Sequence, residues 1–542
     1  MLMGWIEALR RRPIDQAKAR AQTAAIADAT FRDAMGDYDA FAQSDRSVGD
    51  PAFLVGAARD SCGAPVPVRL SPAVLDAHWL IQGATGTGKT TFVLGLVEWA
   101  LAHGAPIGVV DCKAGFFHAA LRSAAAYAYR LSTQARRAFV RRLAVFNPFG
   151  EALPPFNRCA LAPGVSPEVQ AYDVTLVLSR LFDVALSVHM ENILRHLLLL
   201  LIASKLTLVE AALVLQDEVV RGILLERAGN PILKEFFYRT YPSLPKISTD
   251  ALVGRLSALL LPERMQLMLG ADESIDLAGV IARGDPWFVL LGKGSGIPEE
   301  QVTVLGGLVL QSFFQAAYAS DAPRLPYLVA LDEFFHLLGA PALAERFATG
   351  LAALRSFGVH LALVLHELSQ VPPALREAIL THCDYTAAFR SSARNAALLG
   401  DFVPDLDPDL VAAALRRGEP VPARREMHRR LLERLQRLPS RTMYWYDRRQ
   451  AHRALLVRVP DQKTPHELVG LTPEALDEFA EAEGVNVGGF ALPRDVLRAQ
   501  IAARRKRLRE LVNPPITVVP IRPTRLATPP PAATSKRRPQ IG

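Results

Sequence analysis

A single loop near residue 85 constrains the fold more than any other stretch. Gly83-Ala-Thr-Gly-Thr-Gly-Lys-Thr-Thr91 fulfils the pattern G-x-x-x-x-G-K-[ST] in full. The apolar stretch before it, Trp79 to Ile81, predicts a strand, and Phe92 to Leu101 after it predicts a helix. In such a strand-loop-helix unit, backbone N–H groups and the start of the helix converge on one phosphate chain. The pattern therefore predicts a phosphate-binding loop within an α/β domain.

The residue types in this loop have separate roles. Glycines let the backbone curl closely around phosphate oxygens. Lys89 is expected to reach the β- and γ-phosphates, and the Thr90 hydroxyl is expected to ligate Mg²⁺. ATP and Mg²⁺ are therefore the expected cofactors. The predicted nucleotide-binding residues are Gly83, Ala84, Thr85, Gly86, Thr87, Gly88, Lys89, Thr90 and Thr91.

A pair of carboxylates lies far downstream of the loop. The apolar run Tyr327 to Leu331 is followed directly by Asp332 and Glu333. Asp332 is expected to hold Mg²⁺ through water, and Glu333 is expected to polarise the attacking water. Solvated acids after a strand are common on their own. Together with a phosphate loop, they favour a site that hydrolyses ATP.

Three further side chains are candidates for the same site. Arg355 lies on a predicted helix after the Asp-Glu strand, where a cation is suited to stabilise charge on the ATP of a neighbouring subunit. Arg390, at the end of the last predicted strand, is the reserve candidate. His366 ends the strand after Arg355 and is a candidate sensor of the bound nucleotide. A solvated arginine and a structural histidine are the alternatives for these positions.

Asp111 and Lys113 follow another short apolar run, Ile107 to Val110. Open α/β sheets bind ligands at the carboxyl ends of their strands, which is where this pair is predicted to lie. Two interpretations stay open: a salt bridge within the loop, or a contact that couples the site to a neighbouring subunit or to DNA.

Strand and helix patterns alternate in two separate stretches, with helical periodicity alone between them. This arrangement predicts an α/β fold: a parallel sheet with helices on both faces, interrupted by an all-α insertion. The predicted organisation is a helical and loop-like segment at 1–64, the first motor part at 65–165, the insertion at 166–280, the second motor part at 281–403, a C-terminal accessory region at 404–512 and a disordered, basic, Pro-rich tail at 513–542.

Positive charge is concentrated at the C-terminus. The formal net charge is +8, but the stretch from Arg494 onward holds 12 Lys and Arg against 2 acidic residues. The rest is close to neutral, which excludes a generic basic protein that coats DNA. The four scattered cysteines lack C-x-x-C spacing, which argues against a zinc or disulfide framework and favours a reducing compartment. The most apolar run, Leu197 to Ala203, is shorter than the roughly 20 residues of a membrane span, so a buried helix is expected.

The order of these motifs resembles the HerA/FtsK superfamily of DNA-pumping ATPases. Within it, the chain is most similar to the type IV coupling proteins of conjugation and type IV secretion. The resemblance covers about residues 65–403. It rests on the phosphate loop, the strand ending in Asp111-x-Lys113, the Leu-Asp332-Glu333-Phe motif, and Leu-Arg355-Ser-Phe-Gly-Val-His-Leu-Ala-Leu-Val-Leu. It implies a RecA-like P-loop motor that forms a homo-hexameric ring, threads DNA through its pore and binds ATP between subunits.

By position, the resemblance implies that Lys89 and Thr90 bind phosphate and Mg²⁺, that Asp332 and Glu333 form the acidic pair, and that Arg355 acts in trans. Two features depart from the family. Its usual sensor glutamine is replaced by His366, and the transmembrane helices of membrane-anchored coupling proteins are missing. We therefore expect a cytoplasmic protein that reaches the inner membrane only through partners, such as membrane-bound secretion-system components or relaxosome proteins.

Two alternatives stay open at this point. One is a cytoplasmic HerA-like helicase or translocase that works with a nuclease in end resection or phage defence. The other is a nucleotide-gated recruitment protein that binds ATP and a partner but moves no DNA.

Overall fold

The computed structural model describes residues 52–59, 65–70, 75–113, 115–180, 186–292, 297–320, 325–338, 341–400, 424–449 and 454–512. Most of the helical and loop-like segment predicted at 1–64 and the whole of the tail predicted at 513–542 lie outside these residues.

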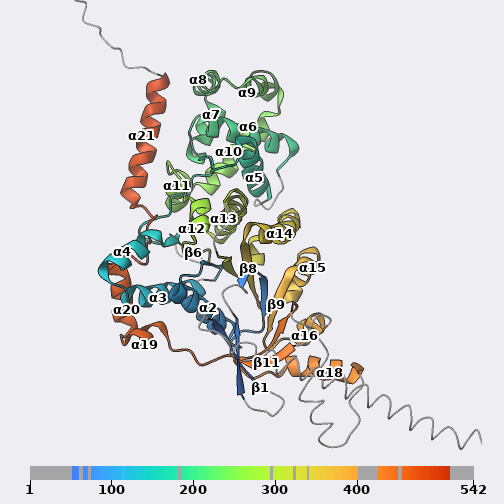
Figure 1. Cartoon of the computed structure of the whole chain (residues 1–542). Helices are drawn as coiled ribbons and strands as arrows, with labels where there is room; N and C mark the ends of the chain where they lie inside the picture. Colours follow the sequence, from blue (N-terminus) through green and yellow to red (C-terminus); the bar gives the residue numbers. More distant parts are fainter. Residues whose placement is uncertain are drawn as a thin grey trace, which may run out of the picture.

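A single sheet of eleven strands runs through the described part of the chain (Figure 1). Its strands are β1 (Phe53–Arg59), β2 (Pro65–Leu70), β3 (His78–Gln82), β4 (Ile107–Asp111), β5 (Ala144–Phe146), β6 (Trp287–Leu290), β7 (Tyr327–Asp332), β8 (Val359–Leu365), β9 (Cys383–Ala388), β10 (Thr442–Asp447) and β11 (Ala454–Arg458). They follow the order β2-β1-β11-β10-β9-β3-β8-β7-β4-β6-β5. Pairing is parallel from β9 to β5 and antiparallel from β9 to β2.

The parallel strands are apolar throughout because helices cover both faces of the sheet. Successive residues point to opposite faces, so Trp79 and Ile81 enter one core and Leu80 enters the other. One core includes α2 (Lys89–His103) and α3 (Gly115–Tyr129). The other includes α13 (Glu299–Ala319), α14 (Pro341–Leu354) and α15 (Pro373–His382). The predicted α/β fold with helices on both faces is confirmed.

Between β5 and β6 the described chain forms helices, with only two isolated bridges. The predicted all-α insertion into the sheet is therefore present. Its α-helices are α5 (Pro167–Arg180), α6 (Val188–Ala203), α7 (Ala211–Gln216), α8 (Glu218–Ala228), α9 (Pro231–Glu235), α10 (Lys246–Leu259), α11 (Glu263–Leu269) and α12 (Leu277–Arg283).

Two apolar helices bear on the question of a membrane span. The run Leu197 to Ala203 lies in α6, where Leu197 and Leu198 are fully buried, as expected. Among the described helices, α13 alone is long and apolar enough to cross a membrane, but 78% of its most apolar window is buried inside the fold. Its burial between the sheet and the insertion is that of a core helix.

The C-terminal residues contact both the sheet and the all-α insertion. The antiparallel pair β10–β11 extends the sheet beside β9. The described helices around it are α16 (Ala393–Gly400), α18 (Arg424–Leu435), α19 (Pro465–Val469) and α20 (Pro473–Ala482). The last helix, α21 (Arg494–Val512), lies along the insertion, far from the sheet (Figure 1). Its Arg504 is buried and donates to Glu210 at 3.0 Å.

Two local predictions are wrong. Residues 53–59, predicted to be loop-like, form β1, because their pairing partner β11 lies some 400 residues further along the chain. A helix, α4 (Thr133–Arg142), precedes β5 where none was predicted. Arg355, predicted to lie on a helix, lies in the 3-10 helix Arg355–Phe357, which continues α14 directly and which Gly358 ends in the left-handed region at φ 70°.

Candidate nucleotide site

The phosphate loop lies at the carboxyl edge of the sheet, between β3 and α2. Both strands next to β3 hold it in place. The Gly83 N–H donates to the Leu365 carbonyl at 3.2 Å, and the Ala84 N–H donates to the Arg390 carbonyl at 2.7 Å. A Cβ atom at Gly83 would lie 2.5 Å from Cβ of Phe389, so only glycine fits this approach. Arg390 therefore contributes its backbone to the loop.

A residue from the far C-terminal part of the sheet fixes the other end of the loop. The Arg441 N–H donates to the Thr87 carbonyl at 2.7 Å. Gly88, at φ 109°, packs so closely that a Cβ there would lie 3.1 Å from Cα of Arg441. Arg441 itself has φ 61°, a left-handed conformation that is uncommon outside glycine and concentrates at functional sites. Sequence reasoning missed Arg441, because no local pattern marks an arginine in the turn before β10.

Lys89 begins α2 and folds back over the loop. Its Nζ lies 2.5 Å from the Gly83 carbonyl, 3.1 Å from the Ala84 carbonyl and 3.0 Å from Nδ1 of His366. Burial lowers the pKa of Lys89 to about 8. Thr90 follows in the first turn of α2 and is exposed at the mouth of the loop.

Asp332 ends β7 at the same edge of the sheet. Its ladder partners are Asp111 on β4 and Val364 on β8. The pKa of Asp332 is raised to about 7, chiefly by burial and also by the charges of Asp111 and Glu333. The Asp111 carboxylate accepts the N–H groups of Lys113 at 2.6 Å and Phe117 at 2.7 Å. Asp111 therefore holds the start of α3, and its partners are backbone groups.

Glu333 joins the two halves of the site. It is 2% exposed and has φ 55°. Its Oε2 lies 3.3 Å from Nζ of Lys113, and its Oε1 lies 3.3 Å from Nε2 of His366. His366 thus bridges Glu333 to Lys89. Because an ammonium only donates, Nδ1 of His366 accepts from Lys89, and the ring proton is then on Nε2, which faces Oε1 of Glu333. Burial and the charge of Lys89 lower the pKa of His366, which favours this neutral tautomer.

Arg355 lies at the opposite edge of the sheet. It precedes β8, while the carboxyl end of β8 adjoins the phosphate loop. Seven strand residues span about 20 Å, which is beyond the reach of an arginine side chain. Nη1 of Arg355 lies 3.1 Å from Oδ2 of Asp384, and the Arg355 side chain is 48% exposed. The fold thus brings Lys89, Asp332, Glu333 and His366 together and keeps Arg355 away from the loop of its own chain.

Several solved structures are similar to this chain. The plasmid coupling protein TrwB, in complex with the non-hydrolysable ATP analogue ADPNP, matches with a TM-score of 0.50 and 16% sequence identity, over 79% of this chain and 92% of that one. The chain shares the TrwB fold. TrwB with GDPNP gives a TM-score of 0.49 at 14% identity, covering 79% and 93% of the two chains. VirB4 of Thermoanaerobacter pseudethanolicus gives 0.49 at 11% identity, covering 77% and 98%.

The likeness to TrwB extends over most of this chain, well beyond the phosphate loop and its two neighbouring strands. It is a likeness of fold, since the sequences differ at most positions. No protein-family model and no curated protein matches the sequence. The assignment of roles within the site therefore depends on the geometry of this chain.

Proposed function

We propose that the protein is a Mg-ATP-dependent motor that moves DNA and serves as a coupling protein in conjugation or type IV secretion. One observation carries the ATPase part of this proposal. Lys89 and Glu333 come from segments more than 240 residues apart, yet both contact His366 at one edge of the sheet. ATP hydrolysis needs a phosphate-binding cation and a carboxylate in one site, and here both lie against the same histidine.

The residues present suit a bound nucleotide and Mg²⁺. A Cβ at Gly86 would meet nothing within 4 Å, so the loop opens onto free space. Lys89 and the loop backbone would hold the phosphates, and Thr90 and Asp332 would hold Mg²⁺. The described residues contain no cluster of three or more His, Cys, Asp or Glu suited to a metal. That agrees with Mg²⁺, which takes few protein ligands and shares phosphate oxygens and water.

Glu333 is proposed to polarise the attacking water, with His366 as the sensor that links it to the phosphate-binding Lys89. Mg²⁺ would neutralise charge on the phosphates. Arg355 is proposed to act on the ATP of a neighbouring subunit, because its side chain is half-exposed at the edge away from its own loop. That role requires an oligomer, and we propose a homo-hexameric ring.

The DNA-moving part of the proposal is supported by the fold shared with TrwB, a plasmid coupling protein. The proposed partners are DNA, relaxosome proteins and membrane-bound secretion-system components. Through these components the protein would lie at the inner membrane.

The test is ATP hydrolysis with and without DNA. Wild-type protein should hydrolyse ATP faster when DNA is added, and Lys89→Ala should abolish hydrolysis. Lys234→Ala is a suitable control, because Lys234 pairs with the exposed Glu226 on the insertion, away from the phosphate loop. Wild-type protein that binds ATP tightly but shows negligible turnover on any DNA, with Glu333→Gln indistinguishable from it, would favour a recruitment protein instead.

A further inference from the structure

Arg158 is a buried cation that no carboxylate neutralises within the described part of the chain. The residue is 3% exposed, and its Nη2 donates to Oε1 of Gln315 at 3.1 Å. Its Nε is buried and has no hydrogen-bond partner among the described residues. The Phe156 ring, with its centroid 5.4 Å from Cζ of Arg158, compensates the charge only weakly. A guanidinium removed from water is costly unless an acid pairs with it, so Arg158 lacks an anionic partner.

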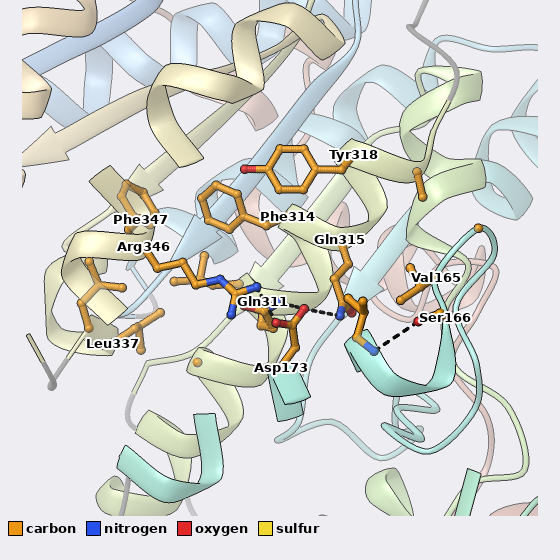
Figure 2. A pocket seen from close by; sticks show the side chains of 16 residues that line it. Val165, Ser166, Asp173, Gln311, Phe314, Gln315, Tyr318, Leu337, Arg346 and Phe347 are labelled. Atoms are coloured by element: carbon orange, nitrogen blue, oxygen red, sulfur yellow. Dashed lines mark hydrogen bonds and ion pairs between the residues drawn. The ribbon is translucent and has the colours of Figure 1, made fainter. Parts of the chain in front are cut away.

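The neighbours of Arg158 fix its position without neutralising it. Gln315 is an amide and carries no charge. Its Nε2 donates to Asp173 at 2.6 Å, and the Asp173 carboxylate already pairs with Arg346 (Figure 2). The Arg158 carbonyl accepts from Nε2 of Gln170 at 2.9 Å, which ties this backbone to α5. Burial lowers the pKa of Arg158 to about 10, so the side chain stays charged at neutral pH.

Arg158 lines a cavity of about 270 Å³, together with residues from 156–163, 272–278 and α13. Part of the cavity wall is apolar, because the buried side chains of Phe156 and Leu277 belong to it. Ligand pockets usually start at about 300 Å³, so this cavity suits a small molecule. Such pockets combine apolar walls with a few polar groups that fix the orientation of the ligand. The Arg158 guanidinium is suited to be one of these groups.

The exposed side of the cavity carries carboxylates. Asp272, Glu273 and Asp276 line the cavity and are exposed. Asp272 pairs with Arg504, whereas the Glu273 carboxylate has no ion pair within the described residues. Carboxylates at this side disfavour a simple anion such as phosphate and attract an ammonium. The charges therefore favour a molecule with a carboxylate for Arg158 at one end and an ammonium for Glu273 at the other.

We propose that this cavity binds a small zwitterion, an amino acid with an apolar side chain. Its carboxylate pairs with Arg158, its ammonium pairs with Glu273, and its side chain packs against the apolar wall. Arg158 is bonded through Gln315 to Asp173, so the bound amino acid stabilises the contact between the insertion and α13. The site goes beyond the proposed function, because binding here requires no ATP hydrolysis.

The test measures the binding of L-leucine, L-alanine, L-valine and L-phenylalanine to the full chain by calorimetry and by thermal unfolding. At least one of them should bind saturably, with a Kd of about 1 mM or below, and should raise Tm as its concentration rises. Leucinamide lacks the carboxylate, and inorganic phosphate lacks the ammonium and the apolar part. Both should bind at least about tenfold more weakly than the best amino acid.

Three variants locate the binding. Arg158→Met removes the charge and should lower the affinity at least about tenfold. Without ligand its Tm should be unchanged or higher, because an apolar side chain replaces a buried charge that lacks an acid. Glu273→Gln should weaken binding and leave the ligand-free Tm unchanged, since Glu273 is exposed. Glu218→Gln changes an exposed carboxylate on α8, outside the cavity, and should bind as wild type does.

Three results would overturn the proposed site. They are the lack of saturable binding by all four amino acids, phosphate binding as tight as that of the best amino acid, and undiminished binding by Arg158→Met. A large fall in the ligand-free Tm of Arg158→Met would also contradict it, because it would show that the chain itself stabilises the Arg158 charge.

Discussion

Asp332 carries a charge that the folded chain disfavours. Its pKa is raised from 3.8 to about 7, chiefly by burial. Between these two values the folded chain binds a proton that the unfolded chain has released, so stability falls as pH rises through this window. Above pH 7 the penalty is complete, and a shift of this size corresponds to up to about 4 kcal/mol. We expect the cost to serve the binding of Mg²⁺.

Asp332→Asn should therefore stabilise the metal-free protein while abolishing ATP hydrolysis. At pH 8 in chelator, the free energy of unfolding should rise by about 1–4 kcal/mol, because the neutral amide removes the buried charge. At pH 5 the gain should shrink to less than about half, since Asp332 is then mostly protonated in the folded wild type. Chemical denaturation at both pH values measures the difference.

The control for this prediction is Asp250→Asn, which changes an exposed carboxylate on α10. Its effect should stay within about 0.5 kcal/mol at both pH values. Equal destabilisation by Asp332→Asn at pH 5 and pH 8 would mean that the Asp332 carboxylate stabilises the fold, contrary to its raised pKa.

The sequence identifies some residues of this site and not others, for a physical reason. Lys89 and Asp332 lie in patterns whose chemistry is local: a curled loop before a helix, and an acid at the end of an apolar strand. Arg441 is placed against Gly88 by the pairing of β10 with β9, which no short pattern encodes. The contact of Lys113 with Glu333 likewise depends on β4 and β7 being neighbours in the sheet.

At the scale of elements, a buried polar cluster joins the insertion to the motor (Figure 2). Asp173 on α5 is 2% exposed and accepts from Gln311 at 2.7 Å and Gln315 at 2.6 Å, both on α13. It also pairs with Arg346 on α14, which leads directly to Arg355. The cluster borders a cavity of about 300 Å³ lined mainly by apolar side chains. Three helices are thus tied together by one carboxylate.

Asp173→Ala should destabilise the fold by about 2–4 kcal/mol, because it strips two buried amides and one guanidinium of their acceptor. This destabilisation is smaller than that expected on breaking a fully buried ion pair, because the Arg346 side chain is 41% exposed. Urea unfolding measures the change. Arg239→Ala, which breaks an exposed pair with Glu235 on the insertion, should cost about 0.5 kcal/mol or less. A comparable effect of the two variants would show that the cluster does not hold these helices together.

Elements are predictable from the sequence where burial is uniform. The strands β3, β4, β7 and β8 are short apolar runs because both of their faces are covered, and their composition alone marks them. In contrast, β1 contains Gly56 and two alanines and is a strand only because β2 and β11 pair with it. The short helix α4 has no buried residue, so its sequence contains no apolar stripe that would predict it.

At the scale of the whole molecule, the chain holds two separated parts of a proposed shared site. Lys89 and Glu333 belong to one edge of the sheet and are linked through His366 within one chain. Arg355 lies at the other edge. If ATP is hydrolysed between subunits, Lys89 of one chain works with Arg355 of the next. A monomer should then bind ATP yet hydrolyse it poorly.

Mixing two inactive variants tests this division. Lys89→Ala and Arg355→Ala should each be inactive, but in a random 1:1 mixed ring about a quarter of the interfaces combine an intact Lys89 with an intact Arg355. Turnover should recover toward that fraction of the wild-type value, provided that each interface works independently. Steady-state hydrolysis with DNA, measured after subunit exchange, gives the result.

The matched control is a mixture of Lys89→Ala with Glu333→Gln. Lys89 and Glu333 contact the same histidine of the same chain, so no interface in this mixture has both intact on one subunit. It should remain inactive. Recovery in this control, or none in the Arg355 mixture, would contradict the division of the site. Recovery in the Arg355 mixture alone would place Arg355 in trans, because an arginine that acted on its own chain's ATP would be missing from every subunit with an intact Lys89.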